Sequence, residues 1–317
     1  MKKLKVCFLG TPQFAAVSLK YLLSDPDYEV VGVVTQPDRP AGRKLQMTAS
    51  DVKVLAREHG LPVLTPENLR KEPEVLQQVK SWSAQIAVVV AFGQILNDEF
   101  LGSFEYGAVN IHGSLLPKWR GAAPIQRSLQ NGDRETGVAL QKIVKQLDAG
   151  DVIGVRRIQV QDDWNANFMY AKLAEMGTEL LKFDLKDFVY GALIPVKQDE
   201  SAVTVAKKID KSEAEINWNL SSEAIHNQVR AFSMGPGSFT WFNEKKIKIH
   251  KTCVKNKSDV DPTRNGFVVG MEKETFFVQC GQGLLEVLEV QPESRNRMSS
   301  ADFLKSHSVE NKMRFGK

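Results

Sequence analysis

Three polar side chains from two separate stretches of the sequence could together transfer an acyl group. Asn110 and His112 lie two residues apart at the end of a run that is typical of a strand, and Asp148 follows in a second stretch. Because side chains alternate between the two faces of a sheet, Asn110 and His112 should point to the same side. An amide donor, a titratable ring and an acid can transfer an acyl group to an amine without a metal or a covalent intermediate.

Taken singly, each of these residues has an ordinary structural explanation. A lone histidine at a strand end is more often structural than catalytic, asparagine is common in turns, and Asp-Ala-Gly-Asp has strong turn composition. The combination favours a catalytic role, because burying polar side chains at the end of an internal strand costs free energy unless they have hydrogen-bond partners or bind a ligand. Gly113 also lets the backbone turn sharply near a ligand, and Pro117 stiffens the stretch.

Apolar runs typical of strands alternate with helical patterns through the first two hundred residues. Strands are predicted at 4–9, 29–35, 87–90, 108–111, 138–144 and 152–160, and helices at 12–23, 51–59, 124–130 and 168–188. The first helix should have Thr11 as its N-cap and Pro12 at its first position. This alternation predicts an α/β fold with a mostly parallel sheet and helices on both faces. Ligands of such sheets bind beyond the carboxyl ends of the strands, where Asn110 and His112 lie.

The pattern changes after residues 190–206, which show little periodicity and are predicted to be a linker. A helix is expected at 221–232 and another at 301–306, with short strands at 239–242, 247–254, 266–269, 275–280 and 284–290. Closely spaced strands of this kind predict a small β-barrel of the OB type. We therefore expect a catalytic domain at 1–189, a linker at 190–206 and a barrel domain at 207–317.

The basic charge of the chain belongs to its second half. The whole sequence has 42 Lys and Arg against 38 Asp and Glu, a net charge of +4. Residues 207–317 hold 18 of these basic residues against 14 acidic ones, so residues 1–206 hold 24 of each. The asymmetry weakly favours a C-terminal part that binds a polyanion, although a solvated basic surface would look the same.

A long loop at 36–48, after the second predicted strand, is the first of two candidate contacts with nucleic acid. It contains the cations Arg39, Arg43 and Lys44. Long loops in a compact domain are usually functional or disordered, and these three cations would suit contacts with phosphate. Composition alone leaves a solvated loop equally open.

The second candidate is the lysine-rich stretch 244–257, which includes Lys246, Lys248 and Lys251. Its lysines alternate with Ile247 and Ile249, so one face of the predicted strand is charged and the other is apolar. A solvated strand would have this pattern, and so would a nucleic-acid groove on a small barrel.

Several other function classes lack their sequence signals. The turn at 10–15 has no Gly-x-Gly-x-x-Gly pattern, which excludes nicotinamide or flavin binding, and no P-loop motif occurs. Cys7, Cys253 and Cys280 have no paired spacing, and no histidine cluster accompanies them, so we expect neither a disulfide framework nor a metal site. No apolar stretch approaches the ~18 residues of a membrane span, and none resembles a secretion signal. We expect a cytoplasmic protein without a membrane partner.

These motifs resemble those of the 10-formyltetrahydrofolate-dependent formyltransferases, and among them the methionyl-tRNA formyltransferase family. The resemblance covers nearly the whole chain and is carried by residues 8–15, 35–43, 110–126, 147–152 and 216–218. Asn-x-His-Gly-Ser-Leu-Leu-Pro at 110–117 specifies only the wider superfamily. The Asp-Arg-Pro-Ala-Gly-Arg loop and the basic C-terminal domain narrow it to the family that acts on tRNA.

The resemblance implies a Rossmann-like catalytic domain, a linker and an OB-like barrel. It implies that Asn110, His112 and Asp148 are catalytic, and that 10-formyltetrahydrofolate, bound in part by Ser114, Leu115, Leu116 and Pro117, is the co-substrate. The acceptor would be the α-amino group of methionine on initiator tRNA, contacted by Arg39, Arg43, Lys44, Lys246, Lys248 and Lys251. We expect a monomer that uses no metal, nicotinamide or flavin and makes formylmethionyl-tRNA for translation initiation.

In this scheme the acceptor amine needs little activation, because an α-amino group titrates near ~7.7–8 and the adjacent ester lowers that value further. The harder task is to stabilise the oxygen that gains negative charge, and Asn110 and His112 are placed to donate to it. Asp148 would orient His112 and help to move the proton. The sequence leaves open whether His112 or Asp148 is the base.

Two alternatives remain from the sequence. The chain could be a formyltransferase of the same superfamily that acts on a small amine, such as glycinamide ribonucleotide or an amino sugar. It could also be a tRNA-binding or folate-binding module without catalytic activity, although the complete set of Asn110, His112 and Asp148 argues against this.

Overall fold

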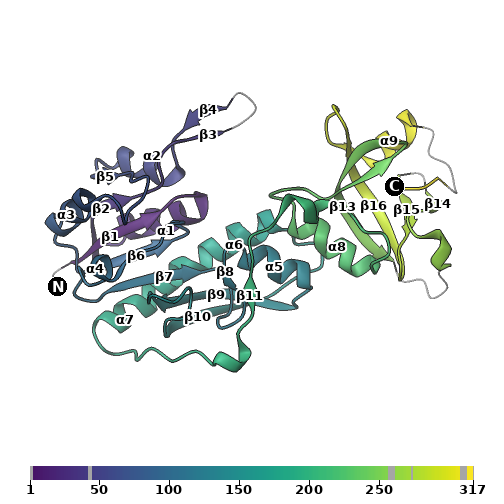
Figure 1. The fold of residues 1–317 in the computed structure, drawn as a ribbon. Helices are drawn as coiled ribbons and strands as arrows, with labels where there is room; N and C mark the ends of the chain where they lie inside the picture. The colour runs from purple at the N-terminus through teal and green to yellow at the C-terminus, as the bar shows by residue number, and fades with distance from the viewer. Residues whose placement is uncertain (1–2, 42–44, 256–260, 273, 308–312, 317) are drawn as a thin grey trace. The chain divides into compact units, whose positions relative to one another are not determined.

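A seven-stranded sheet forms the centre of the first of two units of the chain (Figure 1). The computed structural model describes residues 3–41, 45–255, 261–272, 274–307 and 313–316. The first unit comprises residues 1–124, 135–158 and 170–206, and the second comprises 125–134, 159–169 and 207–317. The segment at 190–206 thus belongs to the first unit by its contacts.

The strand order in the first unit is β10-β9-β7-β6-β1-β2-β5. These strands are β1 (Leu4–Gly10), β2 (Tyr28–Val34), β5 (Val63–Leu64), β6 (Ile86–Val90), β7 (Ala108–His112), β9 (Glu135–Lys142) and β10 (Val152–Gln159). Pairing is parallel from β7 through β6, β1 and β2 to β5, whereas β9 runs antiparallel to β7. The apolar strand β6 is buried along its whole length, as its sequence predicts.

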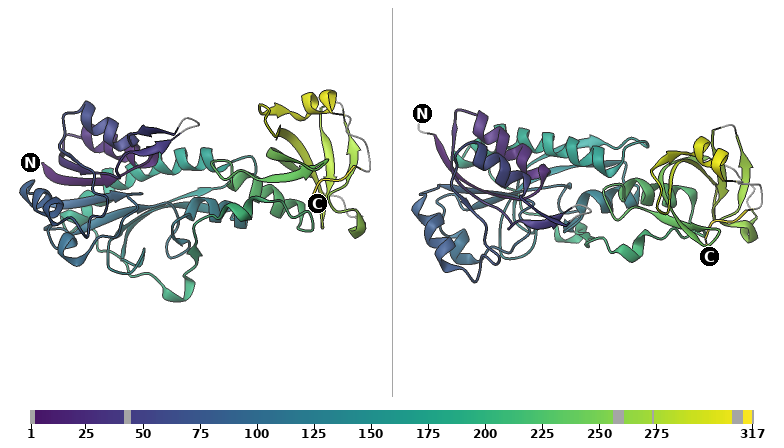
Figure 2. Two further views of the ribbon diagram at one scale, coloured as in Figure 1. Left: turned by 45° about the horizontal axis from the view of Figure 1, so that its top comes forward. Right: turned by 90° about the horizontal axis from the view of Figure 1, so that it is seen from above.

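Helices cover both faces of this sheet (Figure 2). They are α1 (Gln13–Ser24), α2 (Asp51–Glu58), α3 (Pro73–Ser81), α4 (Asp98–Leu101), α6 (Ala166–Glu179) and α7 (Leu185–Val189), with a π-helical turn at Leu180–Asp184 between the last two. On one face, Cys7 and Val89 share a core with α3 and α4. On the other, Gly177 of α6 lies against Ile111 and Val138. The predicted sheet with helices on both faces is confirmed.

Several local details differ from the sequence prediction. Helix α1 begins at Gln13 with Pro12 as its N-cap, whereas the Thr11 hydroxyl accepts the Gln36 N–H at 3.4 Å and donates to the Phe92 carbonyl at 3.3 Å. The predicted loop at 36–48 contains an antiparallel pair, β3 (Arg39–Ala41) and β4 (Gln46–Thr48). Helices α3 and α4 were not predicted.

The second unit is built on an antiparallel sheet of six strands. The strands are β12 (Phe239–Phe242), β13 (Lys245–Lys255), β14 (Val268–Met271), β15 (Phe276–Gln279), β16 (Leu284–Pro292) and β17 (Met298–Ser299). The helices are α5 (Pro124–Asn131), α8 (Ser222–Ala231) and α9 (Ser300–Ser306), with 3-10 turns at Lys211–Ala214 and Pro262–Arg264. The order is β12-β13-β16-β15-β14, and β17 pairs with β16. This curled sheet confirms the predicted small, OB-like barrel architecture.

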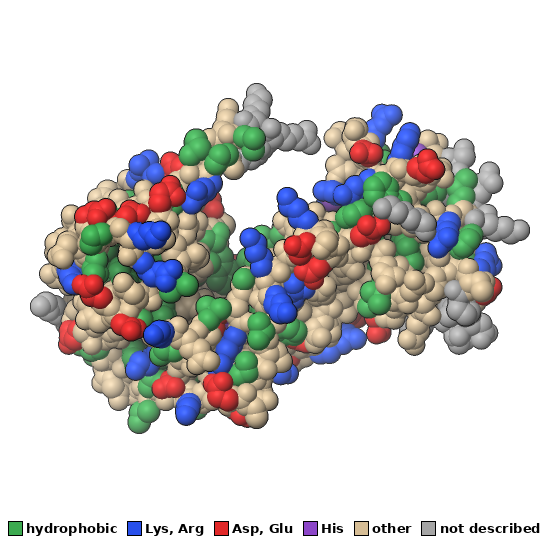
Figure 3. Space-filling view, in the orientation of Figure 1, with side chains coloured by type: hydrophobic (Ala, Val, Ile, Leu, Met, Phe, Trp, Pro, Cys, Tyr) green, Lys and Arg blue, Asp and Glu red, His purple; other side chains and the backbone are tan. Residues whose placement is uncertain are grey.

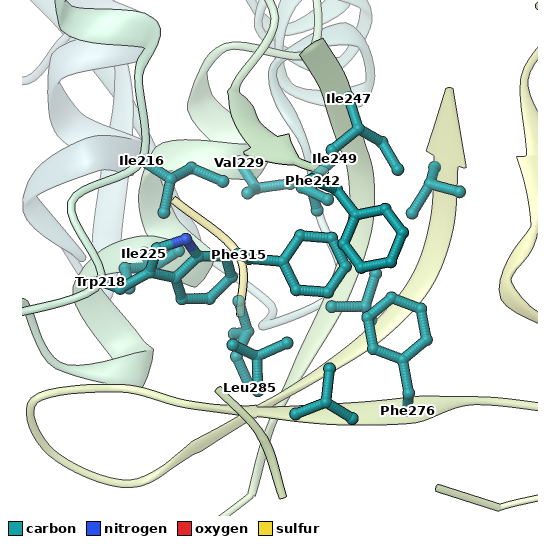
Figure 4. Packing of buried hydrophobic residues seen from close by; sticks show 14 of the residues in the cluster. Ile216, Trp218, Ile225, Val229, Phe242, Ile247, Ile249, Phe276, Leu285 and Phe315 are labelled. Atoms are coloured by element: carbon teal, nitrogen blue, oxygen red, sulfur yellow. The ribbon is translucent and has the colours of Figure 1, made fainter. Parts of the chain in front are cut away.

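Aromatic rings fill the centre of this sheet (Figure 4). The ring of Phe315 stacks on that of Phe276 at 5.5 Å and on that of Phe242 at 4.8 Å. The indole N–H of Trp218 donates to the Thr240 hydroxyl at 2.9 Å, so its one polar atom is satisfied inside the core.

None of the helices that the structure describes is long and apolar enough to cross a membrane.

Candidate active site

Strand β7 carries Asn110 and His112 to the carboxyl edge of the parallel sheet. Asn110 is in register with Val89 of β6 and with Gln141 of β9. Val89 belongs to the apolar core on the α3 and α4 face, so Asn110 and His112 point toward that same face. The His112 side chain is buried, whereas that of Asn110 is partly exposed.

The ring of His112 is held by a backbone carbonyl. Its Nε2 atom lies 2.8 Å from the Trp119 carbonyl oxygen. A carbonyl oxygen only accepts, so Nε2 carries the hydrogen and donates it. Trp119 has a φ of +63°, a left-handed conformation that turns the chain at this position. The other ring nitrogen, Nδ1, is therefore the one left for chemistry.

Asp148 faces that second nitrogen. Its Oδ2 atom lies 3.7 Å from His112 Nδ1, which is close enough for an electrostatic interaction but longer than a hydrogen bond. Oδ2 also accepts the Gly121 N–H at 2.9 Å, and Oδ1 accepts from Gln141 Nε2 at 3.0 Å. Both oxygens thus accept hydrogen bonds from N–H groups, an environment that suits a carboxylate.

The loop that presents Asp148 has a tightly constrained backbone. Asp148 has a φ of +50°, which aspartate tolerates better than most residues. A Cβ atom at Gly150 would lie 1.8 Å from the Lys142 carbonyl oxygen, so only glycine fits there. The turn composition of Asp-Ala-Gly-Asp thus serves to aim the carboxylate at the sheet edge.

The amide group of Asn110 makes no hydrogen bond with any residue that the structure describes. An amide that is partly buried and unpaired can bind a ligand without giving up an internal partner. Asn110, His112 and Asp148 therefore present an amide, one ring nitrogen and a carboxylate at one edge of the sheet. This set fits the oxygen of an acyl group and a nearby proton.

Residues 114–117 lie directly after β7 and are largely enclosed. The Ser114 hydroxyl, which is buried, donates to the Lys118 carbonyl at 2.6 Å. Leu116 is also buried, and Leu115 approaches Gly137 of β9. Folate binding by Ser114, Leu115, Leu116 and Pro117 stays a prediction.

The hairpin β3–β4 carries the first group of predicted tRNA contacts. Arg39 forms an exposed ion pair with Glu67 at 3.2 Å, whereas Arg43 and Lys44 lie outside the described residues. Leu45 and Met47 are 72% and 66% exposed, and hydrophobic side chains cover this hairpin in Figure 3. An exposed hairpin with apolar and charged side chains is suited to contact a large partner.

Strand β13 carries the second group. Ile247 and Ile249 are buried, and Lys246 and Lys248 are partly exposed, as the alternation predicts. Lys248 is in register with Phe239, and the Lys246 ammonium lies 3.6 Å from the centre of the Phe239 ring. Lys251 is exposed beyond a bulge in the strand. Figure 3 shows basic side chains among acidic ones on the visible face of this unit.

Sequence reasoning missed the residues that surround His112 and Asp148. Gln141 lies inside a predicted strand, where a polar residue between apolar ones was a usable signal. Arg120 and Gln198 lie in stretches without periodicity, so no pattern marked them. Among the residues that the structure describes, no group of three or more His, Cys, Asp or Glu side chains could hold a metal ion.

Comparison with known proteins identifies the family of both units. A family model described as "Formyl transferase" matches residues 3–185, and "Formyl transferase, C-terminal domain" matches residues 208–308. The chain is 55% identical over 310 residues to the methionyl-tRNA formyltransferase of Bdellovibrio bacteriovorus, covering 98% of both chains. It is 38% identical to the enzyme of that name from Pseudoalteromonas translucida, covering 96% of this chain and 94% of that one.

Solved structures share the fold at lower identity. A sugar 3N-formyl transferase, WlaRD, crystallised in the presence of dTDP and 5-N-formyl-THF, matches with a TM-score of 0.65 at 20% identity, covering 93% of this chain and all of that one. An N-formyltransferase from Helicobacter canadensis in complex with folinic acid has a TM-score of 0.66 at 21% identity, covering 91% and 99%. By its motifs, its fold and its relatives, this chain belongs to the formyl transferase family, among the methionyl-tRNA formyltransferases.

Proposed function

We propose that this chain transfers the formyl group of 10-formyltetrahydrofolate to the α-amino group of methionine on initiator tRNA, giving formylmethionyl-tRNA. The observation that carries the proposal is the ring of His112, whose Nε2 is fixed by the Trp119 carbonyl while Nδ1 faces Asp148 at 3.7 Å. The similarity to methionyl-tRNA formyltransferases over both units supports the choice of acceptor.

When bound, 10-formyltetrahydrofolate supplies the formyl carbon and N10 as the leaving nitrogen. The Asn110 amide and a protonated Nδ1 of His112 donate to the oxygen that gains negative charge. As the amine nitrogen bonds to the formyl carbon, the bond from that carbon to N10 breaks. The Asp148 carboxylate compensates the charge on the ring and assists in moving the proton that the amine loses to N10 of the departing tetrahydrofolate. One such donor to a developing oxyanion is worth about 10²–10³ in rate.

The remaining assignments extend this proposal. Ser114, Leu115, Leu116 and Pro117 would line part of the folate site. Arg39, Arg43 and Lys44 of the hairpin, and Lys246, Lys248 and Lys251 of β13, would contact tRNA phosphates. We also propose a catalytic domain at 1–189, a connecting segment at 190–206 and a tRNA-binding domain at 207–317, in a monomeric cytoplasmic protein.

The test is transfer of labelled formyl from 10-formyltetrahydrofolate to methionyl-tRNA, with uncharged tRNA as the control. We expect label on the charged tRNA alone. Glycinamide ribonucleotide and a dTDP-linked amino sugar serve as rival acceptors, because the fold is shared with sugar formyltransferases. Faster transfer to either small amine would overturn the proposal, and binding of tRNA or folate without transfer would indicate a non-catalytic module.

A further inference from the structure

The segment at 196–206, predicted to be part of a linker, is hydrogen-bonded to the backbone of Asp148 and to that of Trp119, the residue whose carbonyl holds His112. Val196 exchanges two backbone hydrogen bonds of 2.8 Å with Val152. At its other end, β11 (Val205–Ala206) pairs in parallel with β8 (Arg120–Gly121). Between these anchors Gln198 is only 6% exposed, an unusual degree of burial for a glutamine.

Chemistry fixes the orientation of the Gln198 amide. The Arg120 Nε–H, which can only donate, lies 3.0 Å from Gln198 Oε1. The Gln198 nitrogen therefore faces the backbone oxygens of Asp148 at 2.9 Å and Gly150 at 2.7 Å. Glu200 holds Arg120 from the other side at 2.8 Å, and this hydrogen bond lowers the pKa of the Glu200 carboxyl.

Gln141 extends this series of donors to the carboxylate. Its Oε1 lies 3.2 Å from Gln198 Nε2, the longest of the three contacts of that nitrogen, and accepts one of its two hydrogens in common with a backbone oxygen. Its own nitrogen must then face Asp148 Oδ1, at 3.0 Å, and donate to it. Gln141 is only 1% exposed, so water does not replace these partners. The series from Arg120 through Gln198 and Gln141 ends on Asp148 and leaves Oδ2 on the His112 side.

The same segment also fixes the backbone that holds His112. The Trp119 N–H donates to the Thr204 hydroxyl at 2.9 Å, and the Arg120 N–H donates to the Thr204 carbonyl at 2.9 Å. Trp119 in turn supplies the carbonyl that accepts from His112 Nε2. One stretch of chain therefore sets the positions of both partners in the His112–Asp148 pair.

We propose that Gln198 and Gln141 are positioning residues for formyl transfer, which orient the Asp148 carboxylate toward His112 through one series of hydrogen bonds. This inference rests on the proposed function, because it assigns Asp148 a role in the reaction. Neither glutamine needs to touch a substrate. Their effect on rate comes from the geometry of Asp148, and misplacing a reacting group by about 1 Å can cost roughly 10² in rate.

The experiment compares Gln141→Met, Gln198→Met and the double variant, since methionine keeps the length of the side chain without its polar atoms. We expect each single variant to lower kcat by about 10- to 100-fold, with KM for both substrates within about 2-fold. The kcat of the double variant should lie within about 3-fold of the kcat of the slower single variant, because both residues act through Asp148. A merely structural role would lower the melting temperature without this loss of kcat in the folded enzyme.

Wild type, Asp148→Asn and Gln78→Met are measured in parallel. Gln78 of α3 is exposed and bonds only to Ser81 among the described residues, so its replacement should leave kcat unchanged. An inactive wild type would refute the proposed function, and an active Asp148→Asn would remove Asp148 from the reaction. If both behave as expected and folded Gln141→Met keeps its full kcat, the positioning role is wrong. Gln141→Met decides the matter if Gln198→Met fails to fold.

Discussion

Two histidines, one in each unit, show how differently an imidazole ring can be used. In the C-terminal unit both nitrogens of His226 are engaged, Nδ1 with the Thr252 hydroxyl at 2.9 Å and Nε2 with the Asp162 carbonyl at 3.0 Å. In the N-terminal unit His112 has one nitrogen on a carbonyl and leaves the other facing a carboxylate. A ring with both nitrogens satisfied stabilises the fold, whereas a ring with one nitrogen left over can do chemistry.

The largest effect is expected from removing the ring of His112, of which one nitrogen has a hydrogen-bond partner and the other faces Asp148. His112→Ala should lower kcat by about 10²–10⁴, because it removes both a donor to the charged oxygen and a proton-transfer group. His226→Gln is the matched control and should keep most of the wild-type kcat in the folded enzyme. Equal losses in the two variants would show that the comparison between the rings does not report on catalysis.

The next effect concerns the amide that the structure leaves without an internal partner. Asn110→Ala should lower kcat by about 10²–10³ and leave both KM values nearly unchanged, since the donor acts when negative charge develops. Asn97→Ala is the control: Asn97 caps α4 by accepting the Phe100 N–H at 2.9 Å, so its loss affects stability only. An Asn110→Ala enzyme with normal kcat would remove Asn110 from the reaction.

A smaller effect is expected from the partly exposed lysines of β13, which we assign to tRNA binding and not to the reaction. Lys246→Ala with Lys248→Ala should raise KM for methionyl-tRNA, leave kcat nearly constant, and reduce the slope of log KM against log salt by about one per lysine. Lys80→Ala, which removes an exposed lysine paired with Glu99, is the charge control. An unchanged salt slope would exclude these two lysines from the tRNA contact.

The smallest effect is on stability. Burial lowers the pKa of His226 below its ordinary value of 6.5, so the unfolded chain binds a proton more readily than the folded one does. The contribution of His226 to the free energy of unfolding is therefore complete above pH 6.5 and is lost as the pH falls toward the lowered pKa of its ring. Denaturant unfolding at pH 7.5 and 5 should show a smaller loss of stability for His226→Gln than for wild type. The same pH dependence in both proteins would contradict this role.

The sequence predicted the parts of the fold that periodicity controls. The apolar strand at 87–90 and the alternation of Lys246 to Ile249 were recognised because burial imposes those patterns directly. The pairing inside 36–48 was missed because its residues have no alternating apolar face. Helix α3 was missed because only Val75, Leu76 and Val79 of its nine residues are buried.

For the candidate site, too, the features that follow from strand periodicity could be predicted and the long-range contacts could not. Asn110 and His112 could be placed on one side of the sheet because a strand has a fixed period. The contacts of Gln198 could not be foreseen, because they join positions 48 and 57 residues away in the sequence through single hydrogen bonds. Such long-range polar contacts leave no local pattern, although they decide where Asp148 points.

The partner of His112 is a main-chain oxygen at position 119, and this has an evolutionary consequence. A side-chain acceptor can be deleted by one missense change, but every amino acid supplies the same carbonyl. The ring tautomer therefore depends on the left-handed backbone at position 119 and not on a polar side chain there. Insertions and deletions between 113 and 119 would therefore disturb this hydrogen bond far more than a change of side chain at position 119.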